Sequence, residues 1–294
     1  MSAGTNMNGK VCLVTGANQG IGKETAIGLA KQGATVVITA RDQAKGAAAL
    51  ADIKQRSGND SVTLMTVDFA SFDSIRRFAA GVQAAHPQLH VLVNNAGAYN
   101  AARSVTKDGF ETTFGVNHLG YFLTTKLLLD TIKASAPARI VSVSSGAHAR
   151  GKMNFDDLHG EQSYAGFGAY GQSKLANVLF TYELARRLEG TGVTANCLHP
   201  GVVMTGFGKN NSGFIGSLFG VFQTVGKPWL LTPEKGARTS IYLASSPEVE
   251  GVTGKYYADS KEKESNAISH DTDVARRLWD VSEQMIATPA AATA

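Results

Sequence analysis

The stretch Thr15-Gly16-Ala17-Asn18-Gln19-Gly20-Ile21-Gly22 follows directly on an apolar run, and a helical pattern continues beyond it. Gly16 permits a tight turn, Gly20 lets the backbone approach a pyrophosphate, and Gly22 lets the helix pack close to the strand. The free N–H groups at a helix start attract anionic oxygens. A turn that needs glycine only for its geometry is the alternative. We expect cofactor contacts from Gly16, Asn18, Gln19, Gly20, Ile21 and Gly22.

Short β-branched runs alternate with longer amphipathic stretches along the rest of the chain. Strands that are apolar on both faces and separated by helices must pair in parallel, with helices on both sides. The predicted fold class is α/β, a doubly wound, seven-stranded parallel sheet (Rossmann fold) in a single domain over 10–286, with tails at 1–9 and 287–294. The predicted strands are 11–15, 35–39, 62–67, 91–94, 140–143, 193–198 and 255–257, and the helices are 21–32, 43–57, 71–85, 111–134, 168–189, 234–245 and 271–286.

Composition argues against several classes of protein. Lys and Arg outnumber Asp and Glu by only 28 to 24, without a like-charged block, so we expect no nucleic-acid surface. Cys12 and Cys197 lie in apolar runs, and the seven histidines lack a ligand spacing, so we expect no disulfide framework and no metal. The first nine residues do not resemble a secretory signal, and no apolar run is long enough to be an integral membrane segment. The expected location is cytoplasmic.

The end of the second strand bears on the choice of nucleotide. An acidic residue there would bind a ribose 2′-OH, but Ala40 occupies the place and Arg41 follows it. A guanidinium offers a fork of donors to a 2′-phosphate, and Lys45 adds a second positive charge. The sequence therefore favours NADP(H) over NAD(H). The alternative is that Arg41 is a solvated loop residue, with Asp42 as an NAD ligand or merely a helix cap.

Tyr170 and Lys174 are four residues apart in a helical pattern, so their side chains share a face. A free phenol has a pKa near 10. An ammonium about 4 Å away would stabilise the phenolate by roughly 4 kcal/mol at an effective dielectric of 20, which predicts Tyr170 as the proton-transfer residue. Tyr257 and Lys261 have the same spacing, but no serine at a strand tip accompanies them, so we interpret that match as chance.

Tyr170 has a companion serine. Residues 140–143 form an apolar strand that ends in Ser144 and Ser145, and ligands bind at the carboxyl ends of strands in open α/β sheets. Ser145 would hydrogen-bond a substrate oxygen and hold it against Tyr170. Ordinary turn chemistry is the alternative for both serines.

Taken together, these residues resemble the classical short-chain dehydrogenase/reductase family from about Lys10 to Tyr257. Besides the glycine stretch, Ser145, Tyr170 and Lys174, the motifs are Asp68, Asn94-Asn95-Ala96-Gly97, Asn117 and Pro200-Gly201 followed by Thr205. The resemblance implies the strand order 3-2-1-4-5-6-7 and a catalytic role for Asn117, through a water chain to Lys174. It implies cofactor contacts from Asp68, Phe69, Asn95, Ala96, Gly97, Tyr170, Lys174, Pro200, Gly201, Val203 and Thr205. Alternatively, Asp68 caps a helix and Asn117 satisfies core backbone groups.

Within that family the chain most resembles the retinol dehydrogenase-like subgroup. The stretches Asn154-Phe-Asp-Asp-Leu-His159, Ser173-Lys174-Leu-Ala-Asn177 and His199-Pro200-Gly201 carry this resemblance. Animal members often have an N-terminal membrane anchor, a pattern that the first residues here do not show. Residues 206–232 hold aromatic and aliphatic side chains among glycines, which the resemblance implies to be a substrate lid. A helix packed on the core or a subunit contact is the alternative.

The sequence thus predicts an NADP(H)-dependent oxidoreductase that moves hydride between nicotinamide and a carbonyl or alcohol. The expected substrate is a small apolar molecule: an aldehyde, a ketone or a retinoid-like compound. Two other functions stay open, a non-catalytic NADP(H)-binding sensor and a reductase of carbon-carbon double bonds. The resemblance also suggests a homo-oligomer, because helices such as 111–134 and 168–189 often pair between subunits in the family.

Overall fold

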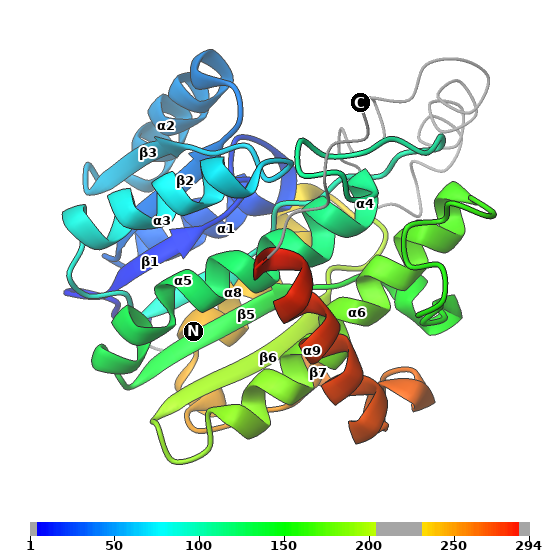
Figure 1. Ribbon diagram of the computed structural model, residues 1–294. Coiled ribbons are helices and arrows are strands. Elements are labelled where there is room, and N and C mark those ends of the chain that lie inside the picture. Colours follow the sequence, from blue (N-terminus) through cyan, green and yellow to red (C-terminus); the bar gives the residue numbers. More distant parts are fainter. Residues whose placement is uncertain (1–4, 204–230, 288–294) are drawn as a thin grey trace.

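The computed structural model describes residues 5–203 and 231–287, which form one sheet in the order β3-β2-β1-β4-β5-β6-β7-β8 (Figure 1). The first seven strands are parallel, as predicted, and β8 pairs antiparallel with β7. The eighth strand was not predicted because it consists of two exposed charged residues without an apolar pattern. The strands are β1 (Val11–Val14), β2 (Thr35–Ala40), β3 (Val62–Thr66), β4 (Val91–Asn94), β5 (Ala138–Val143), β6 (Val193–His199), β7 (Tyr256–Ala258) and β8 (Lys261–Glu262).

Helices cover both faces of this sheet (Figure 1). One face carries α1, α2 and α8, and the other carries α3, α5 and α6, with α9 lying against α6. The helices of the described ranges are α1 (Gly20–Lys31), α2 (Gln43–Ser57), α3 (Phe72–Ala85), α4 (Thr112–Phe114), α5 (Gly120–Ala134), α6 (Gly166–Arg187), α8 (Pro233–Ser245) and α9 (Thr272–Ala287). Shorter turns are η1 (Gly115–Leu119), η2 (Gly146–Arg150), η4 (Pro247–Val249) and η5 (Ala267–His270). None of the helices in these ranges combines the length and apolar character needed to cross a membrane.

The inner strands β1, β2, β4, β5 and β6 are mostly buried because each side of the sheet faces a separate hydrophobic core. On β1, Leu13 belongs to the core under α3, α5 and α6, whereas Cys12 and Val14 belong to the core under α1 and α8. Met7, which precedes the first strand, also packs into the second core. This two-sided burial is the reason why continuous apolar runs indicate parallel strands.

The predicted helix 111–134 is interrupted, and this corrects the sequence-based expectation. The carboxylate of Glu111 accepts the backbone N–H groups of Thr113 and Phe114 and starts α4. A π-helical turn, η1, then separates α4 from α5. The turn places Asn117 and His118 in the interior, each fully buried. Such π turns often occur at functional sites.

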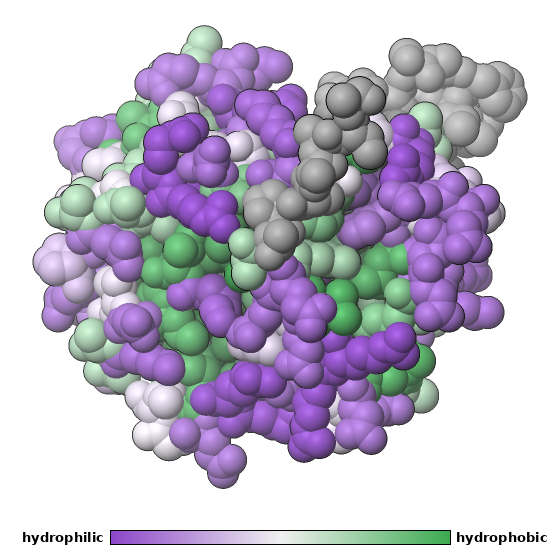
Figure 2. Space-filling view, in the orientation of Figure 1, coloured by the Kyte–Doolittle hydropathy of each residue, from purple (hydrophilic) through white to green (hydrophobic). Residues whose placement is uncertain are grey.

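The last helix, α9, completes the core around α5 and α6. Trp279 stacks on Phe180 at a ring distance of 5.9 Å and contacts Phe122 at 4.9 Å. Its indole nitrogen donates to Glu283, and the guanidinium of Arg187 lies 4.3 Å above the ring. Hydrophobic side chains stay visible on either side of α9, over α5 and near α6 (Figure 2).

Replacing Trp279 by alanine tests this role. We expect Trp279→Ala to lower the free energy of unfolding by about 3–5 kcal/mol, because it opens a cavity beside the rings of Phe122 and Phe180. Arg276→Ala on the same helix is the matched control and should change stability by less than about 0.5 kcal/mol, since its side chain is 61% exposed. Urea unfolding followed by circular dichroism measures both. A loss below about 1 kcal/mol for Trp279→Ala would contradict the packing role.

Candidate active site

The glycine loop between β1 and α1 is shaped as the sequence predicts. Gly16 and Gly20 have φ angles of +64° and +58°, a region that favours glycine. A Cβ on Gly16 would lie 2.8 Å from the Cα of Ala96. The helix begins at Gly20, and the side chain of Gln19 makes no capping hydrogen bond. The first N–H groups of α1 are therefore available to an anion.

Thr15 and Asn95 hold this loop against the end of β4. The hydroxyl of Thr15 accepts the backbone N–H groups of Asn95 at 2.8 Å and of Ala96 at 3.0 Å. The Asn95 amide donates to the carbonyl of Thr15 at 2.7 Å, and a Cβ on Gly22 would lie 2.4 Å from the amide nitrogen. The close contact at Gly22 is thus with Asn95 and with the loop itself. Thr15 was not predicted as a site residue, because its role depends on a contact far along the chain.

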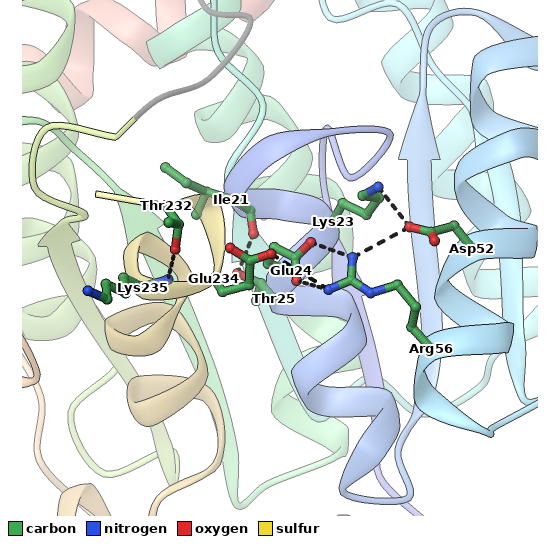
Figure 3. A network of polar contacts seen from close by, with 9 residues as sticks. All are labelled: Ile21, Lys23, Glu24, Thr25, Asp52, Arg56, Thr232, Glu234 and Lys235. Carbon is green, nitrogen blue, oxygen red and sulfur yellow. Dashed lines mark hydrogen bonds and ion pairs between the residues drawn. The ribbon is translucent and has the colours of Figure 1, made fainter. Parts of the chain in front are cut away.

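A polar network joins α1 to α2 and α8 (Figure 3). Arg56 on α2 donates two hydrogen bonds to the buried Glu24 on α1, at 2.6 and 2.7 Å. Lys23 donates to Asp52 at 2.7 Å, and this bond is the largest cause of the lowered pKa of Asp52. Arg56 also lies 3.9 Å from Glu234 on α8. These bonds fix the helix that follows the glycine loop relative to its neighbours.

The predicted nucleotide-selecting residues lie at the end of β2. Arg41 and Lys45 are exposed, and Ala40 is buried. Asp42 caps α2 by accepting the backbone N–H of Lys45 at 2.9 Å, which lowers the pKa of Asp42. Of the two alternatives for Asp42, an NAD ligand or a helix cap, the structure shows the helix cap. Across the described residues, the guanidinium of Arg41 has no hydrogen-bond or ion-pair partner, so it is available to an external anion.

Asp68 and Phe69 follow β3. The carboxylate of Asp68 accepts the N–H of Ala70 at 3.1 Å and lies 3.7 Å from Lys107. Asp68 does not cap α3, since Ser71 does so. Phe69 is buried in the core, where its ring would lie 3.2 Å from a Cβ on Gly120. Its side chain serves packing, and the predicted cofactor contact of Phe69 stays a prediction.

Lys174 projects from α6 into the interior beside Gly97. Its ammonium donates to the carbonyl of Val143 at 3.0 Å, and its own carbonyl accepts the hydroxyl of Ser144 at 2.7 Å. A Cβ on Gly97 would lie 3.7 Å from the Lys174 nitrogen. Burial lowers the pKa of Lys174 to about 7. The side chain is thus poised between its charged and neutral forms.

Asn117 connects the π turn with the loop after β4 and with α6. Its amide oxygen accepts the N–H of Ala98 at 2.7 Å, and its amide nitrogen donates to the Ala98 carbonyl at 2.9 Å and to the Ser173 hydroxyl at 3.0 Å. Asn117 therefore does satisfy backbone groups, as the alternative stated. The water chain from Asn117 to Lys174 stays a prediction.

Ser145 and Tyr170 meet at the carboxyl end of the sheet. A hydrogen bond from Ser145 lowers the pKa of Tyr170, but burial has the larger effect and raises this pKa to about 12. The pKa differs from the expected depression by Lys174, whose nitrogen lies 5.8 Å from the ring centroid. The physical reason is that burial disfavours both charged forms: it penalises the phenolate of Tyr170, and it lowers the pKa of Lys174, so that the lysine carries a full positive charge less often. Ser145 also accepts the N–H of Ala147, as expected for turn chemistry.

The turn after β6 brings the last predicted cofactor residues to the same edge. Gly201 has a φ of +82° and donates its N–H to the ring of His199 at 3.1 Å. Val203 and Ile21 both approach Gly236 on α8, where a Cβ would lie 2.6 and 3.3 Å from their side chains. Pro200 is partly buried beside them. Thr205 and most of the predicted lid, 206–232, lie outside the described residues.

Two further aromatic residues belong to this site and were not predicted. The ring of Tyr99 meets that of Tyr170 edge-on at 5.9 Å. Tyr121 on α5 is fully buried, and the Lys174 nitrogen lies 5.6 Å from its ring centroid. The four-residue spacing of the motif gives no signal for either, because both come from other parts of the chain.

Comparison with known proteins agrees with this geometry. The family model described as short chain dehydrogenase matches residues 10–213. Retinol dehydrogenase 14 of Homo sapiens is 48% identical over 294 residues, which cover 95% of this chain and 87% of that protein. The crystal structure of an uncharacterized protein from Mycobacterium paratuberculosis has a TM-score of 0.77 and 33% identity, and covers 97% of this chain and 96% of its own.

A second solved structure, described as a Pseudomonas aeruginosa RhlG/NADP active-site complex, has a TM-score of 0.69 and 27% identity and covers 87% of this chain and 96% of its own. The fold, the glycine loop and the pair Tyr170 and Lys174 agree with the sequence match. The chain belongs to the short-chain dehydrogenase/reductase family, in its retinol dehydrogenase-like subgroup, and is an oxidoreductase that acts on CH-OH or C=O groups.

Proposed function

We propose that this protein is an NADP(H)-dependent reductase of apolar carbonyl compounds that also oxidises the corresponding alcohols. The observation that carries the proposal is the convergence of two groups beside the buried Lys174: Ser145 lies close enough to Tyr170 to lower its pKa, and the Lys174 nitrogen lies 5.8 Å from the Tyr170 ring centroid. The end of β5 supplies Ser145 as the partner of the substrate oxygen, and α6 supplies Tyr170 as the proton donor. Lys174, one turn further along α6, adds a positive charge beside them.

The residues present fit a nicotinamide dinucleotide. Gly16, Gly20 and the uncapped start of α1 form a cradle for a pyrophosphate. Lys174 has three N–H donors, and the described residues accept one of them, at Val143. The remaining donors, which lie near Gly97, suit ribose hydroxyls. A bound nicotinamide would supply or accept the hydride.

The protein's own groups supply the proton chemistry. With its pKa raised to about 12, Tyr170 is a neutral phenol at pH 7, which is the form that can donate a proton to a carbonyl oxygen. Ser145 holds the same oxygen and stabilises the negative charge that develops on it. Lys174 stabilises the phenolate that Tyr170 becomes after donation. In the direction of alcohol oxidation, that phenolate takes the proton back.

NADP(H) is favoured over NAD(H) by the charges at the end of β2. Arg41 and Lys45 are exposed there, and Asp42 is occupied as a helix cap. An uncommitted guanidinium beside an ammonium suits a 2′-phosphate. The similar RhlG structure is described as a complex with NADP.

Removal of Arg41 tests the nucleotide preference. We expect Arg41→Ala to raise the KM for NADPH by about tenfold or more, with an effect below about twofold on the KM for NADH, because one charge-assisted contact is worth about 1.5–3 kcal/mol. Steady-state kinetics with the two nucleotides measures the difference. Arg77→Ala, an exposed arginine on α3, serves as the control. Equal changes with both nucleotides would rule out a role in 2′-phosphate binding.

An apolar substrate is favoured by two hydrophobic residues near the site. Phe167 on α6 is 57% exposed and lies three residues before Tyr170, and Val202 is 63% exposed beside the turn after β6. Exposed apolar side chains at a site mouth favour an apolar ligand. The similar relative is named for retinol, an apolar alcohol.

The decisive experiment is a screen of NADPH oxidation with aldehydes, ketones and retinoids, followed by product analysis after reduction of an enone. We expect turnover with apolar carbonyls and an allylic alcohol as the enone product. A saturated ketone would instead establish a reductase of carbon-carbon double bonds. NADPH binding without turnover on any member of the panel would establish the sensor alternative.

A further inference from the structure

A buried imidazole lies directly behind Ser145. His148 belongs to η2, and its Nδ1 lies 2.7 Å from the carbonyl oxygen of Ser145. The backbone N–H of His148 donates to the same oxygen at 3.0 Å. The proposed function gives His148 no role, yet this residue makes two bonds to the backbone of Ser145.

The hydrogen bonds of the ring determine which nitrogen carries the proton. The Ser145 carbonyl can only accept, so Nδ1 of His148 must donate. On the other side of the ring, Nε2 accepts the backbone N–H of Asn266 at 3.2 Å and is therefore unprotonated. Burial lowers the pKa of His148, and the bond to Ser145 opposes this effect. The ring is thus a neutral imidazole with one fixed tautomer.

The ring is held from two further elements. The side-chain amide of Asn266 donates to the carbonyls of His148 at 3.2 Å and of Ala149 at 3.0 Å, which ties η2 to the segment before η5. The ring of Tyr256 on β7 lies 4.7 Å from the ring of His148, and its hydroxyl lies 3.3 Å from Nδ1, farther than the Ser145 carbonyl oxygen at 2.7 Å. Tyr256 in turn stacks on His199, at 5.9 Å. These contacts leave the imidazole little freedom to turn away from Ser145.

Ser145 needs such support because its neighbour in the chain supplies none. Gly146 has no side chain, and nothing lies within 4 Å of the place where its Cβ would stand. On that side of the Ser145–Gly146 peptide no side chain packs, and the carbonyl of the peptide is held by the backbone N–H and the ring of His148. The bond from His148 to the Ser145 carbonyl restrains this peptide.

We propose that His148 is a positioning residue, whose Nδ1–H holds the backbone of Ser145 so that the serine hydroxyl meets Tyr170. The inference rests on the proposed function, since it assigns the orientation of Ser145 within that reaction. It predicts that the donor at Nδ1, and not the imidazole as such, matters for turnover.

Two substitutions separate the two ring nitrogens. An amide N–H stands near the position of Nδ1 in His148→Asn and near that of Nε2 in His148→Gln. We expect His148→Gln to lower kcat by about 10- to 100-fold, because a small displacement of a catalytic group has effects of this size. His148→Asn should stay within about threefold of the wild type. NADPH affinity, measured by fluorescence titration, should not change in either variant.

A double-mutant cycle distinguishes positioning of Ser145 from a general loss of structure. In a Ser145→Ala background, His148→Gln should cause no further loss of kcat, because the hydroxyl that it positions is absent. Should His148→Gln not yield folded protein, Asn266→Ala takes its place in the cycle; it removes the bonds to the two η2 carbonyls and the cap that the Asn266 amide oxygen gives to the N–H of Ile268 at the start of η5. We expect it to lower kcat by about threefold in the wild type and not at all in Ser145→Ala. His270→Gln, an exposed histidine of η5, is the control.

The outcomes separate this inference from the proposed function. Wild-type turnover that is lost in Tyr170→Phe supports the proposed function in the same assay. Equal kcat values for His148→Gln and His148→Asn, or full additivity with Ser145→Ala, would then overturn the role of His148 alone. A wild type without turnover on the whole carbonyl panel would overturn both.

Discussion

Tyr170→Phe is expected to reduce kcat for carbonyl reduction by about a thousandfold, within the range typical for loss of a general acid. The substitution removes only the phenol oxygen, and the ring keeps its contact with Tyr99. Because the lost interaction belongs to the transition state, kcat and kcat/KM should fall together while NADPH affinity stays nearly unchanged.

The chain provides its own control for this experiment. Tyr257 and Lys261 repeat the four-residue spacing, but they lie on β7 and β8 and not on a helix. Tyr257→Phe should leave kcat unchanged, as measured by NADPH oxidation. If Tyr170→Phe kept activity within a few fold of the wild type, Tyr170 would not be the proton donor.

Lys174→Met is expected to abolish turnover and, at the same time, to stabilise the protein. Methionine fills the same volume without a buried charge, whereas Lys174 has one described acceptor, Val143. We expect a gain of roughly 2 kcal/mol in the free energy of unfolding at pH 6 without added nucleotide. For a domain of this size, the gain corresponds to a rise in Tm of about 4–8 °C.

The gain should depend on pH in a definite direction. The pKa of Lys174 is lowered from 10.5 to about 7, so between these values the unfolded chain binds a proton that the folded chain does not. Wild-type stability therefore receives a rising contribution from Lys174 as pH increases through this window. The advantage of Lys174→Met should accordingly be largest below pH 7 and shrink towards pH 10.

Thermal unfolding at several pH values tests this expectation. Lys133→Met, at an exposed position near the end of α5, should show neither the gain nor its pH dependence. A lower Tm for Lys174→Met across the whole pH range would mean that the buried ammonium stabilises the fold.

The sheet and the main site residues could be predicted because their signals are local. The inner strands are buried on both faces, which leaves apolar runs in the sequence, and the spacing of Tyr170 and Lys174 is a property of one helix. The position of Ser145 follows from the rule that ligands bind at strand ends. None of these inferences requires knowledge of a distant contact.

The parts that could not be predicted depend on tertiary structure. The π turn around Asn117 interrupts a pattern that is helical on both sides, and β8 is too short and polar to show a strand pattern. The role of Thr15 depends on Asn95, and the ring of His148 is fixed by Asn266, both of which lie far away in the sequence. The pKa of Tyr170 depends on how deeply the folded chain buries it, which spacing does not report.

The position of α9 also bears on how the protein is made. During synthesis α5 and α6 leave the ribosome before α9, so the rings of Phe122 and Phe180 are at first not covered by Trp279. Hydrophobic side chains that are transiently exposed in this way are prone to associate with other chains. The nascent chain therefore covers these rings only after α9 has been translated, and a premature stop before α9 would leave an aggregation-prone product.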